Sequence, residues 1–193
     1  MLEWTAAAFI LINVSLATRQ NMWSWPFGVV GVSLYLYVFA AAKLYSDAGL
    51  QVFFLVMQFY GWYHWARGGV EHSRSLSAIT RLSRRGWLLT FAGAALWTAV
   101  VGTLMHRHTD AAAPYPDAFA TILSVIAQFL MTRKILENWT LWILADIVSV
   151  GLYVYKALYP TAVLYTIFLV VCVQGYRDWR ATQRSGVQRG GAA

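Results

Sequence analysis

The sequence predicts an all-α integral membrane protein with seven transmembrane helices. Of its 193 residues, 59% are apolar and 12% are charged, and the mean hydropathy is +0.52. Soluble domains are roughly 45–50% apolar and about 25% charged, so this chain has too few charged side chains to cover a soluble surface. With 4 prolines, 14 glycines and one cysteine, it is also not a disordered, collagen-like or disulfide-stapled chain.

Seven apolar runs have the length and composition expected of helices that cross a hydrocarbon core about 30 Å thick. They are Trp4–Thr18; a run within Gln20–Ala42 that opens at Pro26, which a first helical turn tolerates; Ala48–Ala66; Gly86–Met105; Ala118–Thr132; Asn138–Tyr155; and Ala157–Tyr176. Barrel strands of about 9–11 alternating residues do not fit such long, continuous runs. No cation precedes the first run, so we expect no cleaved signal peptide.

The cations fall unequally on the two sides of the membrane that seven spans define. Twelve of the 15, Arg74 among them, lie on the side of the C-terminus, and only Lys43, Arg107 and Lys156 lie on the other. The positive-inside rule then predicts an inner-membrane protein with its N-terminus outside and its C-terminus in the cytoplasm. We interpret the net charge of +7 as this topology signal and not as a nucleic-acid-binding surface, with contact to anionic lipid headgroups as a secondary effect.

Landmarks recur in the same order in two parts of the chain. Asn21–Trp25 and Asn138–Trp142 begin the two blocks, a Tyr-x-Tyr follows in each, and each closes on Gly-x-x-x-Trp, at Trp65 and at Trp179. The offset is 117–118 residues at the front and 114 at the back, which predicts a deletion of about four residues in the second copy. We therefore expect one domain over residues 1–193, with parallel three-helix repeats at about 4–66 and 118–180 around a linker helix at about 86–105.

The sixth run carries the most informative side chains. Asn138, Trp142 and Asp146 are spaced i, i+4 and i+8, so they share one band of a helix, with Trp139 beside them and Tyr153 further along. A carboxylate inside a membrane is costly and normally faces protein or water. Asp146 therefore either lines a site or is a hydrogen-bonded strut between helices. The two tryptophans either belong to an interfacial aromatic belt or grip a flat ring.

Other polar side chains extend this candidate site. Gln128 lies on a polar seam of the fifth run and is large enough to bind an amide or a sugar hydroxyl, whereas the smaller hydroxyl residues of that seam are expected to serve helix packing. The third run carries Gln51 and Gln58, of which we expect one to be structural. The candidates that complete the set are Asn21, Trp23, Trp25, Gln51, Gln58 and Tyr153.

Motifs of catalysis are missing from the sequence. It has no Gly-rich phosphate loop, no metal-ligand spacing, no nucleophile elbow and no ATPase signature. His106 and His108 stand in a polar loop without further ligands, and Cys172 is alone in an apolar run. We therefore expect a non-enzyme that uses no cofactor and no metal.

Several stretches resemble the PnuC family of vitamin-precursor transporters over roughly residues 20–180. They are Trp23-Ser-Trp25-Pro-Phe-Gly28, Leu44-Tyr-Ser-Asp47-Ala-Gly-Leu-Gln51, Tyr60-Gly-Trp-Tyr-x-Trp65 and Gln128-Phe-Leu-Met-Thr-Arg133-Lys-x-x-Glu137-Asn138-Trp-x-x-Trp142-x-x-x-Asp146. The resemblance implies a homotrimer with the 3+1+3 plan of SWEET sugar carriers. It also implies facilitated diffusion of nicotinamide riboside, trapped inside by phosphorylation, through a pocket lined by Gln128, Asn138, Trp139 and Trp142. Relatives carry thiamine, riboflavin or deoxynucleosides.

The residues themselves are compatible with such a substrate. An indole face attracts a pyridinium cation by about 0.5–2 kcal/mol, amides can bind the carboxamide and ribose, and Asp146 could supply a distant counter-charge. Thiamine, which is also a cationic aromatic, satisfies the same argument. Two other classes stay open at this point: a proton-coupled exporter of small cations that uses Asp146, and a membrane receptor or structural subunit that binds without flux.

Overall fold

A computed structural model describes residues 2–41, 45–67 and 79–190, without the side chains of 45–47 and 186–190; Lys43, Leu44 and Arg74 lie outside the described residues. The described chain is almost entirely helical. The helices are α1 (Leu2–Thr18), α2 (Ser24–Ala41), α3 (Tyr45–Arg67), α4 (Arg84–His108), α5 (Pro114–Thr132), α6 (Asn138–Tyr155) and α7 (Tyr159–Gly190). All seven predicted helices are therefore present.

The helix boundaries agree best for α6, which begins and ends where the sequence predicted. Helix α5 begins earlier than expected, at Pro114, because proline suits the first turn of a helix, where its missing N–H has no partner to lose. Helix α7 continues to Gly190 instead of ending at Tyr176. Its 32 residues span about 48 Å at 1.5 Å per residue, so we expect its arginine-rich end to project beyond the hydrocarbon core.

Four of the described helices are long and apolar enough to cross a membrane by length and composition: α2, α4, α5 and α7. Helix α1 is apolar but shorter. Helices α3 and α6 are not among these four, and both carry polar side chains, Gln51 and Gln58 on α3 and Asn138 and Asp146 on α6. Several candidate site residues therefore lie on helices outside this set.

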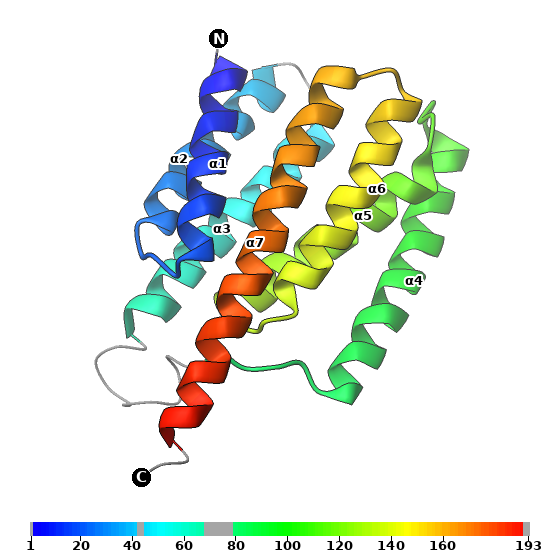
Figure 1. The fold of residues 1–193 in the computed structure, drawn as a ribbon. Coiled ribbons are helices and arrows are strands. Elements are labelled where there is room, and N and C mark those ends of the chain that lie inside the picture. Colours follow the sequence, from blue (N-terminus) through cyan, green and yellow to red (C-terminus); the bar gives the residue numbers. More distant parts are fainter. Residues whose placement is uncertain (1, 42–44, 68–78, 191–193) are drawn as a thin grey trace.

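Six of the helices form a closed ring. Helix α1 packs on α2, α2 on α3, α3 on α5, α5 on α6, α6 on α7, and α7 returns to α1 (Figure 1). Helix α4 stands outside this ring and packs only on α5, where Ala94 and Gly102 allow a close approach. Its other faces expose large apolar side chains such as Leu88, Leu89 and Leu96, which is typical of a surface in contact with lipid.

The ring has two distinct ends (Figure 1). Helix α1 begins at one end and α7 finishes at the other, and α1, α3, α5 and α7 all run in the same direction. The end at which these four helices finish carries most of the described cations, among them Arg19, Arg67, Arg133 and Lys134, and we call it the cation-rich end. The cations that the sequence places on one side of the membrane thus lie mostly at one end of the molecule.

Corresponding helices of the two triplets, α1–α3 and α5–α7, have boundaries 114 positions apart. Helix α5 ends 114 positions after α1 (Thr132 and Thr18), and α7 begins 114 positions after α3 (Tyr159 and Tyr45). Helices α2 and α6 agree at both of their ends. The contacts between the triplets follow the same correspondence. Since α1 corresponds to α5 and α3 to α7, the α1–α7 contact corresponds to the α3–α5 contact.

The turns that follow α1 and α5 are alike bond for bond. Gln20 and Lys134 both have positive φ, 53° and 51°. The amides of Gln20 and Lys134 each donate to the carbonyl oxygen three residues earlier in the chain. The amides of the following residues each donate to the carbonyl oxygen five residues earlier, which completes the Schellman arrangement that ends a helix.

The predicted offset of 117–118 and the four-residue deletion are therefore wrong. Asn138 corresponds to Ser24, Trp139 to Trp25 and Trp142 to Gly28. Duplication itself stays a prediction, which these matches favour.

Candidate functional site

Four tryptophans close the cation-rich end of the ring: Trp25, Trp65, Trp139 and Trp179, here called the tryptophan cluster. All are at most 6% exposed. Trp25 meets Trp65 edge to face at 5.1 Å between ring centroids, and their counterparts Trp139 and Trp179 do so at 5.6 Å. Trp65 and Trp179 also lie 6.0 Å apart. The cluster therefore crosses from one triplet to the other and fills the ring at this level.

Trp25 and Trp139 each lie against a glycine of the following helix. A Cβ at Gly61 would overlap ring atoms of Trp25, and a Cβ at Gly175 would stand 2.8 Å from atoms of Trp139. Neither indole has appreciable exposed surface, since Trp25 is 2% and Trp139 is 0% exposed. In this conformation both predicted site residues are core packing residues.

A polar group from the first triplet lies next to this cluster. Asn13 of α1 donates from Nδ2 to the carbonyl oxygen of Ser24 at 2.6 Å. A Cβ at Gly28 of α2 would overlap both the Asn13 amide and Oε1 of Gln58 from α3, so the two amides meet over this glycine. Gln58 is 5% exposed, and its Oε1 has no hydrogen-bond partner among the described residues.

The second triplet places an indole and a carboxylate at the corresponding level. Trp142 of α6 is the counterpart of Gly28, and Cys172 of α7 is the counterpart of Gln58. Trp142 is partly buried between two apolar clusters. One turn further along α6, Asp146 is 5% exposed and faces the Cys172 thiol. The second triplet thus supplies a flat ring and a carboxyl group where the first supplies amides.

Gln128 of α5 completes this level. Its neighbour Phe129 and the nearby Tyr60 of α3 both lie under the Arg133 guanidinium, at 5.3 and 6.0 Å, which brings this part of α5 beside the part of α3 that carries Gln58. We call the set Asn13, Gln58, Gln128, Trp142 and Asp146 the polar layer.

Several buried atoms of the polar layer are unsatisfied. Gln58 Oε1, Gln128 Nε2, Trp142 Nε1 and Asp146 Oδ2 make no hydrogen bond to any described residue. A buried polar atom without a partner costs about 1–3 kcal/mol, and native proteins keep few of them. A layer that holds a carbonyl acceptor, an amide donor, an indole and a carboxylate in this condition is suited to bind a flat, hydrogen-bonding molecule with positive charge.

Asn138, the first residue of α6, directly precedes Trp139 of the tryptophan cluster. It is fully buried and donates from Nδ2 to the carbonyl oxygen of Ile135 at 2.6 Å, while its Oδ1 has no described partner. One side of this amide therefore fixes the turn before α6, and the other is available to a ligand.

The remaining predicted residues are not brought into the polar layer. Asn21 accepts the Trp23 amide at 2.9 Å in the turn before α2, and Trp23 is 66% exposed. Tyr153 packs on Tyr165 at 5.0 Å near the opposite end of α6. Gln51 is only partly buried, two turns before Gln58 on α3. These four lie toward the ends of the helices or outside them.

Sequence reasoning missed Asn13 and Gly28. Asn13 is the one amide inside the apolar α1, a signal of the same kind that singled out Gln128. Gly28 gave no signal of its own, because a glycine in an apolar helix is common in membrane proteins. Its role becomes visible only when the 114-residue register pairs it with Trp142.

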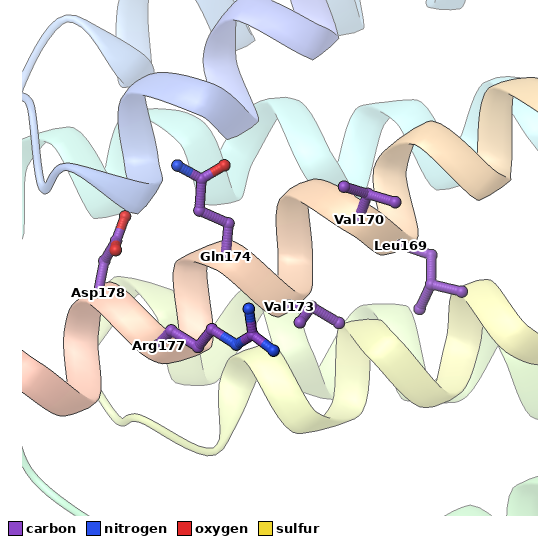
Figure 2. A pocket seen from close by; sticks show the side chains of 6 residues that line it. All are labelled: Leu169, Val170, Val173, Gln174, Arg177 and Asp178. Atoms are coloured by element: carbon purple, nitrogen blue, oxygen red, sulfur yellow. The ribbon is translucent and has the colours of Figure 1, made fainter.

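The two seams between the triplets are unequal. At the α3–α5 seam, Phe129, Tyr60 and Arg133 pack together. Their counterparts at the α1–α7 seam, Ser15, Gln174 and Arg19, line a surface groove instead. Gln174 also borders an open hollow along α7, lined by Leu169, Val170, Val173, Gln174, Arg177 and Asp178 (Figure 2). All six lie on one helix, so the hollow encloses no ligand and is not the candidate site.

A ring of apolar helices around a buried polar layer, closed at one end, defines a multi-pass membrane transport protein. Residues 1–181 match the nicotinamide mononucleotide transporter family, and the chain belongs to this family.

Named relatives agree with this class. The chain is 27% identical over 192 residues to the nicotinamide riboside transporter PnuC of Escherichia coli (strain K12), covering 88% of this chain and 80% of that one. It is 28% identical over 172 residues to the riboflavin/roseoflavin transporter RibM of Streptomyces davaonensis, covering 88% and 79%. The crystal structure of a vitamin B3 transporter PnuC matches with a TM-score of 0.75 and 26% identity, covering 96% of this chain and 83% of that one. The predicted fold class and family are confirmed.

Proposed function

We propose that this protein takes up nicotinamide riboside by facilitated diffusion across the inner membrane, with its C-terminus in the cytoplasm. The observation that carries the proposal is the polar layer, a set of polar side chains from α1, α3, α5 and α6 in which four atoms are buried without a hydrogen-bond partner among the described residues. The pyridinium ring would lie on Trp142, with Asp146 as its counter-charge. Gln58, Gln128 and the free side of Asn138 would bind the carboxamide and the ribose hydroxyls.

The chemistry of the layer favours a nucleoside over a nucleotide. None of its five members is basic, and its one charged member is the acidic Asp146. A phosphate group buried there would meet a like charge instead of an Arg or Lys partner, which is strongly unfavourable at low dielectric. Riboflavin is neutral and gains nothing from Asp146. The cationic nucleoside therefore fits better than the nucleotide or riboflavin. Thiamine is also a cation, and uptake assays distinguish it from nicotinamide riboside.

Movement through the protein requires the tryptophan cluster to part. We infer that the two triplets rock against each other, so that the polar layer opens in turn to each side of the membrane. An inside-negative potential of about 100 mV is worth about 2.3 kcal/mol per charge, which equals about 50-fold accumulation of a monovalent cation. Uptake then needs no ion coupling, and phosphorylation inside the cell would retain the product. Assembly as a homotrimer stays a prediction.

Uptake into sealed proteoliposomes tests the proposal. We expect saturable flux of nicotinamide riboside that increases when an inside-negative potential is imposed with valinomycin and potassium. Nicotinamide mononucleotide, riboflavin and thiamine are measured in parallel, and liposomes without protein give the background. Faster flux of thiamine or riboflavin would reassign the substrate. Tight binding of nicotinamide riboside without any flux would indicate a receptor.

A further inference from the structure

The segment Ile79–Leu82, here called the strap, covers the cation-rich end of the ring just before α4 begins. Ile79 is 7% exposed and belongs to the same apolar cluster as the four tryptophans. Its carbonyl oxygen accepts a hydrogen bond from Nε2 of Gln183 on α7 at 3.0 Å. An isoleucine from a connecting segment is therefore part of the plug that closes the ring.

The strap is attached by its backbone to the turn between α5 and α6. The Thr80 amide donates to the carbonyl oxygen of Lys134 at 3.1 Å, and the Leu136 amide donates to the carbonyl oxygen of Thr80 at 3.0 Å. These two bonds form the parallel β-bridge between Thr80 and Ile135. Lys134 meanwhile places Nζ 4.7 Å from the Trp65 ring, so the same turn also reaches across to the first triplet.

Glu137 holds the strap with a buried carboxylate. It is 4% exposed, its Oε1 accepts from Nε of Arg81 at 3.1 Å, and its Oε2 accepts from the Leu82 amide at 2.7 Å. The Arg81 side chain is 65% exposed, so that half of the contact is solvated and weak. The bond from Leu82 is short and charge-assisted, which makes it the stronger half.

This attachment is one-sided. The position that corresponds to Glu137 in the first triplet is Trp23, which is 66% exposed and has no carboxylate to offer. Glu137 also directly precedes Asn138, the first residue of α6. The carboxylate therefore lies at the start of α6, two residues before Trp139 of the tryptophan cluster.

We propose that the strap is a latch on the cation-rich end and that Glu137 is its positioning residue. The inference rests on the proposed transport function, because a substrate that leaves the polar layer toward this end must pass the tryptophan cluster. That cluster cannot part while Ile79 is packed into it. By binding Leu82 and Arg81, Glu137 keeps Ile79 packed in the tryptophan cluster. When these contacts break, the cation-rich end can open.

Cysteine labelling tests the role of Glu137 without requiring transport. In Ile79→Cys, we measure the rate of modification by a maleimide added to detergent-purified protein, with the parent protein giving the background of buried Cys172. Adding Glu137→Gln should raise the labelling rate about tenfold, because a neutral amide loses the charge-assisted bonds. Arg81→Gln should raise it less than threefold, and Asp178→Asn on α7 serves as the matched control. Equal rates with Glu and Gln at position 137 would overturn the assignment.

A reversible cross-link tests whether the strap must move. Residues paired across a β-bridge are close enough for a disulfide, so Thr80→Cys with Ile135→Cys should lock the strap on the turn. We expect oxidation to reduce nicotinamide riboside uptake at least tenfold, reduction to restore it, and ligand affinity to change less than threefold. The two single-cysteine variants should not respond. Full uptake by the cross-linked protein would overturn the latch. Absent uptake in the reduced parent would count against the proposed substrate alone, and the labelling result would still decide the latch.

Discussion

Replacing Trp139 by alanine should mainly lower the stability of the protein, whereas replacing Trp142 by alanine should mainly weaken ligand binding, although the two residues are neighbours on α6. Trp139 is fully buried, lies on Gly175 and meets Trp179 edge to face. Its truncation leaves a cavity in the tryptophan cluster, for which large-to-small aromatic substitutions cost about 3–5 kcal/mol. Trp142 is only partly buried and its Nε1 is unpartnered, so its truncation removes less packing.

The expected change in binding follows from the proposed stacking. Losing an indole face beneath a pyridinium cation costs about 0.5–2 kcal/mol, which raises Kd about 2- to 30-fold. The assay is thermal unfolding of purified protein in detergent, followed by titration with nicotinamide riboside in every variant that stays folded. Trp142→Phe keeps an aromatic face and should bind between the wild type and Trp142→Ala. A Trp142→Ala protein with unchanged Kd, or a Trp139→Ala protein as stable as the wild type, would refute the reasoning.

Three further substitutions test the packing and the layer. Gly61→Ala should lower the thermal stability, because overpacking against Trp25 costs about 1–3 kcal/mol. In the same melting experiment, Gly93→Ala should leave the stability unchanged or raise it by up to about 1 kcal/mol, because nothing lies within 4 Å of the added Cβ. Gln58→Leu removes an unpartnered buried oxygen, so the melting temperature should hold or rise while titration shows Kd several-fold higher; equal affinity would remove Gln58 from the site. Gln20→Gly relieves a positive φ of 53° and should stabilise by about 1 kcal/mol, a gain that a melting curve identical to that of the wild type would contradict.

Most of the fold could be predicted because apolar length and charge act locally along the chain. The α6 boundaries were predicted from sequence because Asn138 begins and Tyr155 ends an uninterrupted helical run. The repeat register was not, because aligning similar letters placed Asn21 against Asn138. The true register is set by the two Schellman turns and by contacts of Trp25 and Trp139 with glycines of the next helices. Such contacts join residues far apart in the sequence.

The candidate site was predicted only in part. Gln128 and Asp146 were found because a polar side chain inside an apolar helix signals an interior position, and the structure buries both. Asn21 and Trp23 were singled out as landmarks of the first block, yet they belong to a turn that precedes α2. The strap was missed altogether, since Glu137 and Arg81 are distant in sequence and no pattern predicts that they meet.

The two seams between the triplets hold them together by different contacts. The α3–α5 seam holds aromatic rings beneath a guanidinium, whereas the α1–α7 seam combines a surface groove with a buried hydrogen bond from Nε1 of Trp179 to the carbonyl oxygen of Ala17 at 3.1 Å. Opening the molecule along α3 and α5 would separate stacked groups, and opening it along α1 and α7 would break that bond. Wedges introduced on these opposite flanks should therefore impair transport to different degrees.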